Sequence, residues 1–349
     1  MNYKIYHLSH TDLDGYGCQM VVKNYFENVA FYNSNYGKEI DERINEILNN
    51  ISTENFENSL ILITDLNLTL EQAKEIEAKL QVNQQNIQIL LLDHHKSGQD
   101  CEQKYQWYFL DSSRCATQIT YDFFSSILGE NPQLAKTVSV INAVDIWLED
   151  DVHFELGKVC LGFISGAREL NRIMFPLENS NYILTLLENA QPLFDEPKPH
   201  IRLDENIHKL KKSFFRGNLE DDTLDNFISR YNVKLLSQNK NKMQIEYDGH
   251  KGILTYNIGN VSIIGNDFLK SNPDFDFFMD VTSRKTISLR ANGGVDVSLM
   301  AARLGNGGGH PNASGGLLNA FKDSFVYDTI RKQIHDIILA KGANNATRS

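Results

Sequence analysis

The stretch KIYHLSHTDLDGYG, residues 4–17, joins a short apolar run to a cluster of histidine, aspartate and glycine. Two more apolar runs, LILIT at residues 60–64 and IQILLL at residues 87–92, also end at acidic or histidine residues. Such runs are typical of strands that are covered on both faces of a parallel sheet. Between them, residues 16–25 and 70–80 have the apolar spacing of helices. This alternation predicts a parallel α/β sheet in the first third of the chain.

The rest of the chain changes character twice. Helical spacing continues at residues 116–128 and 134–144 and loosens in the proline-containing region 176–224. Beyond this region the apolar period becomes two, which predicts a hairpin turning at Asp248 and Gly249. We also expect strands at 275–281 and 286–290, a helix at 297–304, a glycine-rich loop at 305–316 and a final helix at 322–340. The expected fold is α/β, with a parallel-sheet N-terminal domain at 1–175, a helical connector at 176–224 and a smaller mixed α/β domain at 225–342.

Composition narrows the class of protein. Of the 349 residues 41% are hydrophobic and 23% charged, and no stretch approaches the about 20 apolar residues that span a bilayer. The net charge of −11 argues against binding to long duplex nucleic acid but leaves short anionic ligands open. The first residues lack the apolar core of a secretion signal, and four cysteines without a CxxC pair suit a reducing compartment. We expect a cytoplasmic protein without a membrane span.

Side chains that can bind metal follow each of the first three apolar runs. His10, Asp12 and Asp14 alternate after the first run and would project to one side of an extended segment. Asp65 ends the second run, although alone it would fit a helix N-cap equally well, and the triplet at residues 93–95 ends the third. Ligand sites of parallel α/β sheets lie at the carboxyl ends of the strands. The pattern therefore predicts that these side chains converge.

Asp145, in the segment INAVDIW, adds a further carboxylate near the end of a predicted helix. Several ionised aspartates in one cleft repel one another unless cations compensate them, which favours two divalent ions. Imidazole and carboxylate ligands without thiolate suit Mn²⁺, with Mg²⁺ or Co²⁺ as substitutes. Pairs of such ions promote the hydrolysis of phosphoesters.

These motifs resemble those of the DHH phosphoesterase family. HTDLDG at residues 10–15, Asp65, the Asp-His-His triplet at 93–95 and Asp145 occur in the family's order. Residues 288–316, SLRANGGVDVSLMAARLGNGGGHPNASGG, resemble the core of the C-terminal domain associated with this family, so the resemblance spans nearly the whole chain. It implies a metal-dependent phosphoesterase.

The resemblance also implies roles for single residues. His95 would contact the scissile phosphate or assist the leaving group, and Asp93 would orient the histidines. One metal would be bound by His10, Asp12 and Asp65, and the other by Asp14, Asp65, His94 and Asp145, so that Asp65 bridges the two.

The glycine-rich segment of the C-terminal domain suggests a second anion-binding element. Gly308 and Gly309 free backbone N–H groups for a close approach to an anion, and His310 and Arg290 add side-chain donors to phosphate. Family relatives use this segment to hold the nucleotide end away from the scissile bond. We expect the same use here.

The leading hypothesis for function is a 3′-to-5′ exonuclease that degrades oligoribonucleotides of a few residues to nucleoside 5′-monophosphates. It depends on similarity to the nanoRNase branch, notably in SIIGNDFL at residues 262–269 and in GGGHPNASGG at 307–316. A phosphodiesterase for linear or cyclic dinucleotides, a phosphatase for 3′-phosphoadenosine 5′-phosphate and a non-catalytic nucleotide sensor are the alternatives. The expected partners are short oligonucleotides or dinucleotides, and a homodimer stays open.

Overall fold

The computed structural model describes residues 3–54, 56–82 and 86–346, which divide into two compact units. The first unit comprises Met1–Ala167 and Ser180–Leu210, and the second comprises Arg168–Asn179 and Lys211–Ser349. The predicted connector, residues 176–224, contains helices, and its residues divide between the two units. The domain boundaries expected from the sequence otherwise stay predictions.

The first unit is built on a five-stranded parallel sheet in the order β2-β1-β3-β4-β5. Its strands are β1 (Tyr3–Ser9), β2 (Val29–Asn33), β3 (Asn58–Thr64), β4 (Asn86–Asp93) and β5 (Tyr108–Leu110). The three apolar runs form the central strands β1, β3 and β4, as predicted, whereas the edge strands β2 and β5 had not been expected. The carboxyl ends of all five strands therefore meet at one edge.

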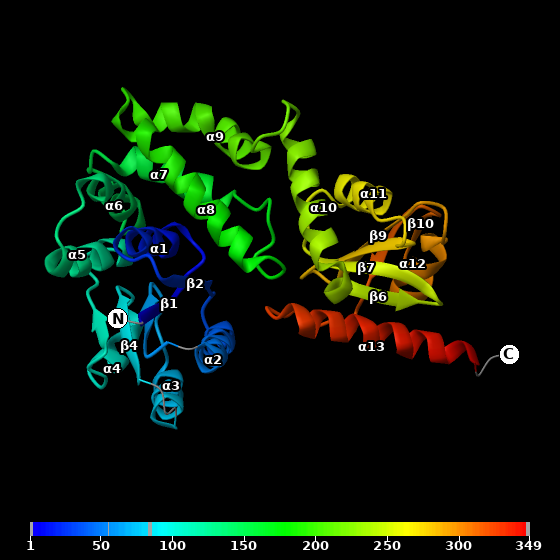
Figure 1. Ribbon diagram of the computed structural model, residues 1–349, viewed down its shortest axis with the longest axis horizontal. Helices are drawn as coiled ribbons and strands as arrows, with labels where there is room; N and C mark the ends of the chain where they lie inside the picture. Colours follow the sequence, from blue (N-terminus) through cyan, green and yellow to red (C-terminus); the bar gives the residue numbers. More distant parts are fainter. Residues whose placement is uncertain (1–2, 55, 83–85, 347–349) are drawn as a thin grey trace. The chain divides into compact units, whose positions relative to one another are not determined.

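Helices cover both faces of this sheet, and alternate strand residues pack on opposite layers (Figure 1). Ile5, Leu62 and Leu92 pack with Ile119 and Phe124 of α5 (Ala116–Leu128) on the same face as α1 (Leu13–Tyr25). The other face is covered by α2 (Lys38–Thr53) and α3 (Leu70–Val82). The remaining helices are α4 (Gln99–Glu102), α6 (Pro132–Asp145), α7 (Phe154–Ser165), α8 (Pro176–Ala190) and α9 (Pro199–Arg216), with 3₁₀ turns η1 (Lys96–Gly98) and η2 (Gln191–Asp195).

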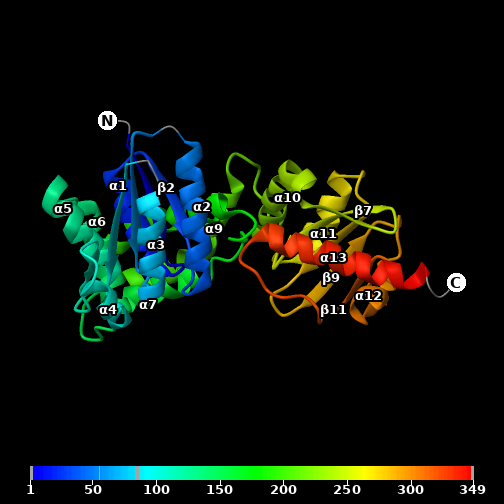
Figure 2. The same cartoon turned by 90° about the horizontal axis from the view of Figure 1, so that it is seen from below.

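The second unit contains a mixed six-stranded sheet in the order β10-β11-β9-β8-β7-β6. Its strands are β6 (Gln244–Tyr247), β7 (His250–Tyr256), β8 (Phe277–Val281), β9 (Thr286–Ala291), β10 (Gly308–His310) and β11 (Ala313–Leu317). Helices α10 (Leu224–Met243) and α11 (Val261–Ser271) lie on one face, and α12 (Val297–Gly305) and α13 (Tyr327–Ala346) on the other (Figure 2). The predicted α/β fold class, with a parallel and a mixed sheet, is confirmed.

Two glycine-containing turns show where the predictions of this unit succeed and fail. The β6–β7 hairpin turns at Asp248 and Gly249, whose positive φ angles of 48° and 77° are those the predicted two-residue turn requires. The segment 305–316, expected as a loop, instead forms the β10–β11 hairpin. Its glycines allow this pairing, because a Cβ on Gly309 would lie 2.6 Å from the carbonyl oxygen of Ala313.

Across the described residues, no helix is both long enough and apolar enough to cross a membrane.

Candidate active site

The first motif converges through the start of a helix rather than through an extended strand. Helix α1 begins at Leu13, and Asp12 is its N-cap, whose Oδ1 accepts a 3.0 Å hydrogen bond from the N–H of Gly15. A side chain on Gly15 would collide with the backbone of His10, so glycine is required at this turn. Asp14 consequently lies in the first helical turn and is buried.

Asp14 is held by a helix from a distant part of the chain. Its Oδ2 accepts from the N–H of Ala116 and its Oδ1 from the N–H of Thr117, both at 2.8 Å. These amides are the first N–H groups of α5, which lack partners within the helix and carry its positive dipole end. The arrangement stabilises a carboxylate at a fixed position next to the strand ends.

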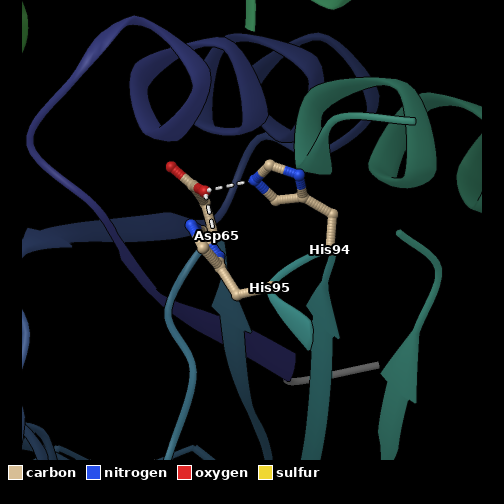
Figure 3. Close-up of side chains that lie close together, drawn as sticks. All are labelled: Asp65, His94 and His95. Atoms are coloured by element: carbon tan, nitrogen blue, oxygen red, sulfur yellow. Dashed lines mark ion pairs between the residues drawn. The ribbon is translucent and has the colours of Figure 1, made fainter. Parts of the chain in front are cut away.

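Asp65 follows β3 in a left-handed backbone conformation with a φ of 56°. Non-glycine residues adopt this region rarely and mostly at functional or turn positions. Asp65 does not cap the next helix, because Thr69 Oγ1 accepts the hydrogen bond from Gln72 N–H at the start of α3. The conformation instead places the buried Asp65 carboxylate beside the imidazoles of His94 and His95, as Figure 3 shows.

Three predicted ligands, all aspartates, surround the imidazole of His94. Its Nε2 lies 3.7 Å from Asp14 Oδ2, 3.4 Å from Asp65 Oδ1 and 3.6 Å from Asp145 Oδ2. Asp145 reaches this position as the last residue of α6. The structure therefore brings together the four residues of the second predicted metal site.

The first predicted metal site forms a separate group on the other side of Asp65. His10 Nδ1 lies 2.8 Å from Asp12 Oδ2 and 3.6 Å from Asp65 Oδ2. Donor atoms of these three side chains all lie within 4.8 Å of one another, the spacing of a metal-binding group. Asp65 is common to both groups, because its two oxygens face the two histidines.

Protein groups alone do not compensate the charges of this cluster, as the shifted pKa values of three of its side chains indicate. Burial and the neighbouring Asp14 carboxylate raise the pKa of Asp65 well above its ordinary value. Burial, together with Asp14 and Asp65, raises the pKa of Asp145 to about 8. Burial opposes a charge on His10, but the nearby carboxylates of Asp12 and Asp65 outweigh it and raise the pKa of His10 to about 10.

The donor set fits divalent cations. The buried atoms His10 Nδ1 and Asp65 Oδ2 have no hydrogen-bond partner of good geometry among the described residues, although ions would satisfy both. Cations would also hold Asp65 and Asp145 in their ionised forms. Oxygen and imidazole ligands are those of intermediate divalent metals. The ligand roles of these residues, and the number and identity of the ions, stay predictions.

His95 lies in a hydrogen-bonded chain that includes two tyrosines missed in the sequence. Asp93 Oδ1 accepts from His95 Nδ1 at 2.7 Å, and Asp93 Oδ2 accepts from the hydroxyl of Tyr108 at 3.1 Å. His95 Nε2 lies 3.0 Å from the hydroxyl of Tyr36. Burial opposes a charge on His95, but Asp93 outweighs it and raises the pKa of this imidazole. This hydrogen bond is compatible with an orienting role for Asp93, which stays a prediction.

Cys115 is a third side chain near the site that the sequence did not single out. It caps α5, since its Sγ accepts from Gln118 N–H at 3.4 Å. Donor atoms of Asp14, Cys115 and Asp145 lie within 4.8 Å of one another. No local signal marks this neighbour, because its proximity depends on the packing of α5 against α1.

The predicted substrate-binding residues lie in the second unit. His310 of β10 pairs with Ala313 of β11, and Ala313 pairs with Arg290 of β9. Residues paired directly across antiparallel strands point to the same face, so His310 and Arg290 flank the small side chain of Ala313. Arg290 Nη2 also donates to Ser262 Oγ at 2.7 Å. A Cβ on Gly308 would meet nothing within 4 Å, so packing does not explain this glycine.

Comparisons with known proteins match both units. The DHH family, N-terminal domain, matches residues 4–143. A 3′,5′-cyclic-nucleotide phosphodiesterase of Helicobacter pylori (strain ATCC 700392 / 26695) is 46% identical over 96% of this chain and 98% of its own length. Oligoribonuclease NrnB of Bacillus subtilis (strain 168) is 26% identical over 94% of this chain and 76% of its own. The crystal structure of an uncharacterised protein from Helicobacter pylori G27 matches with a TM-score of 0.91 at 43% identity, covering 97% of this chain and 99% of that one.

Proposed function

The chain belongs to the DHH family, and on that premise we propose that it is a Mn²⁺-dependent phosphodiesterase that releases nucleoside 5′-monophosphates from small ribonucleotides. The observation that carries the proposal is the approach of His94 Nε2 to carboxylate oxygens of Asp14, Asp65 and Asp145, at 3.4 to 3.7 Å. When bound, a pair of divalent ions supplies an activated water and stabilises negative charge on the phosphoryl oxygens.

The two groups that share Asp65 would hold these ions. His10 and Asp12 would complete the first site with Asp65. Asp14, His94 and Asp145 would complete the second. The amides of α5 fix the Asp14 carboxylate before any ion arrives, so less ordering is left for the binding step.

His95 would act as the general acid. The Asp93 carboxylate raises the pKa of His95 and accepts a hydrogen bond from Nδ1, and both effects favour the ring with protons on both nitrogens. Nε2–H then donates to the Tyr36 hydroxyl at 3.0 Å. We infer that the leaving oxygen of the substrate replaces this hydroxyl and receives the proton, as in general acid catalysis by a positioned histidine.

In the second unit, Arg290 and His310 would bind a phosphate or sugar of the substrate away from the scissile bond. Their common face on the sheet presents two side-chain donors, the guanidinium of Arg290 and the imidazole of His310. The open space at Gly308 would let its backbone N–H approach the same anion.

Two substrate classes fit the proposal. The sequence motifs favour short oligoribonucleotides, as does the similarity to an oligoribonuclease. The 46% identical relative named a 3′,5′-cyclic-nucleotide phosphodiesterase favours 3′,5′-cyclic mononucleotides. Both classes yield a nucleoside 5′-monophosphate when the P–O3′ bond is cleaved, so one site geometry serves both.

The test is a substrate panel with the purified full chain in Mn²⁺. It should contain labelled di- to pentaribonucleotides, 3′,5′-cyclic AMP, a cyclic dinucleotide and 3′-phosphoadenosine 5′-phosphate. We expect 5′-monophosphates from the first two classes, and the Asp93→Ala, His94→Ala double variant is the control. Hydrolysis of 3′-phosphoadenosine 5′-phosphate, and of no other compound in the panel, would favour the phosphatase alternative. Tight nucleotide binding without turnover above the control would contradict the proposal and favour a sensor.

A further inference from the structure

A small pocket of about 160 Å³ lies beside the proposed metal cluster, within the first unit. Trp147 is 57% exposed and Leu161 38% exposed at this pocket. Pockets for a whole drug-sized ligand are on the order of 300–1,000 Å³, so this one suits a single part of a substrate. Its lining consists of the carboxylates Asp12, Asp14 and Asp145 and the apolar side chains Leu13, Val144, Trp147 and Leu161.

Trp147 occupies a position at the end of α6 where the backbone conformation does not explain a tryptophan. Its N–H donates to Val144 O at 3.3 Å, and the N–H of Leu148 donates to Ala143 O at 2.8 Å, the two bonds of a Schellman motif that closes α6. This position requires a left-handed backbone, and the φ of Trp147 is 57°. Glycine or asparagine occupies it at least cost. Termination of α6 alone would therefore favour glycine.

Two contacts fix the indole ring of Trp147 while leaving much of it exposed. Its Nε1 donates to Glu149 Oε1 at 2.8 Å. The ring packs edge-to-face on Phe154, with centroids 5.1 Å apart and planes at 84°. An exposed aromatic ring that is already ordered loses little conformational entropy when a flat ligand stacks on it.

We propose that Trp147 is the stacking platform for a nucleobase of the substrate, adjacent to the phosphate that the metal cluster binds. The inference rests on the proposed function, because it needs a nucleotide at that cluster. The carboxylates of Asp12, Asp14 and Asp145 set the place of the phosphate, and the indole lies in the same pocket. Every base has a π face, so the platform selects for a base over none but tolerates different bases.

Tryptophan fluorescence tests the platform directly, because the sequence has two tryptophans and replacing Trp107 leaves Trp147 as the reporter. The Trp107→Phe variant leaves Trp147 as the sole indole, and Trp107 lies outside the pocket. The variant would be titrated with AMP and with ribose 5-phosphate, which has the same phosphate but no base, in the presence of Mn²⁺. AMP should quench the emission, and ribose 5-phosphate should leave it nearly unchanged. Equal responses, or AMP binding seen by calorimetry without quenching, would overturn the inference.

Kinetics provide a second, independent test. Trp147→Gly relieves the left-handed backbone, which offsets the lost contacts with Glu149 and Phe154, so its melting temperature should change little. Its KM for a diribonucleotide should rise on the order of tenfold, since stacking contributes about 1–3 kcal/mol per base, while kcat should change less. Trp147→Phe should retain most of the affinity.

A wild-type KM in the stably folded Trp147→Gly variant would refute the platform and leave the proposed function intact. If the unmodified chain hydrolysed none of the phosphodiesters of the panel, the proposed function itself would fail. The two failures are therefore distinguishable.

Discussion

Replacing Asp65 by asparagine should stabilise the metal-free first unit and abolish its response to manganese. The Asp65 side chain is 2% exposed, and burial with the Asp14 carboxylate raises its pKa well above the ordinary value. The folded chain therefore keeps a proton at Asp65 at pH values where the unfolded chain has released it. By linkage the wild type is most stable below the unfolded pKa of about 4 and loses stability as pH rises from there toward the folded pKa.

The magnitude follows from the same linkage. One proton of difference between the two states costs about 1.4 kcal/mol per pH unit. Each pH unit between the unfolded pKa and the folded pKa should thus lower the stability of the wild type by that amount relative to the Asp65→Asn variant. Asparagine also tolerates the left-handed φ of 56° at this position, so the backbone gives no opposing penalty.

Urea unfolding in EDTA and in Mn²⁺ would measure this effect. Tryptophan emission reports on the first unit, because both Trp107 and Trp147 belong to it. In EDTA near pH 7 the Asp65→Asn variant should be the more stable protein. With Mn²⁺ at 100 times its dissociation constant the wild type should gain about 2.7 kcal/mol and the variant little, so that the advantage of the variant shrinks by about that amount. Asp150→Asn, at an exposed position of the same unit, is the control and should change neither result. A variant that is less stable in EDTA, or that gains as much from Mn²⁺, would refute the reasoning.

Three further predictions concern other parts of the molecule. Gly308→Ala should fold normally and weaken substrate binding severalfold, because a Cβ there meets no protein atom. Gly307→Ala should lower the melting temperature, because its Cβ would collide with the opposite strand. If the two variants had the same KM and the same melting temperature, this prediction would be wrong. Tyr108→Phe removes the 3.1 Å hydrogen bond to Asp93. The free energy of unfolding should fall by about 1 kcal/mol and kcat about tenfold. An unchanged kcat would exclude a positioning role for Tyr108. Mn²⁺ affinity should rise with pH up to about 8, because binding displaces the proton that burial and neighbouring carboxylates hold on Asp145, and calorimetry that finds no pH dependence would contradict it.

The central strands and the residues at their ends were predictable because they depend on local patterns. β1, β3 and β4 are apolar runs, and the carboxyl ends of parallel strands meet at one edge whatever the details of packing. Helix α2 could have been predicted in the same way, since Ile40, Ile44, Ile47 and Ile51 recur at helical spacing and are all buried. The short edge strands β2 and β5 give weaker signals, because their length allows little periodicity.

The parts of the site that escaped prediction depend on contacts between distant segments. Asp14 accepts a hydrogen bond from the N–H of Ala116, which lies 102 residues away in the sequence, and no local pattern encodes that pairing. Tyr36 is likewise 59 residues from His95, to which it hydrogen-bonds. The β10–β11 hairpin was missed because consecutive glycines ordinarily indicate a loop, whereas here they permit close pairing of two strands.

Two cations that share one carboxylate are central to the proposed mechanism, and anomalous diffraction from crystals soaked in Mn²⁺ tests for them most directly. We predict two peaks, with Asp65 coordinating both, His10 and Asp12 completing one site, and Asp14, His94 and Asp145 completing the other. Density for no ion, or for ions that Asp65 does not touch, would contradict the proposed mechanism.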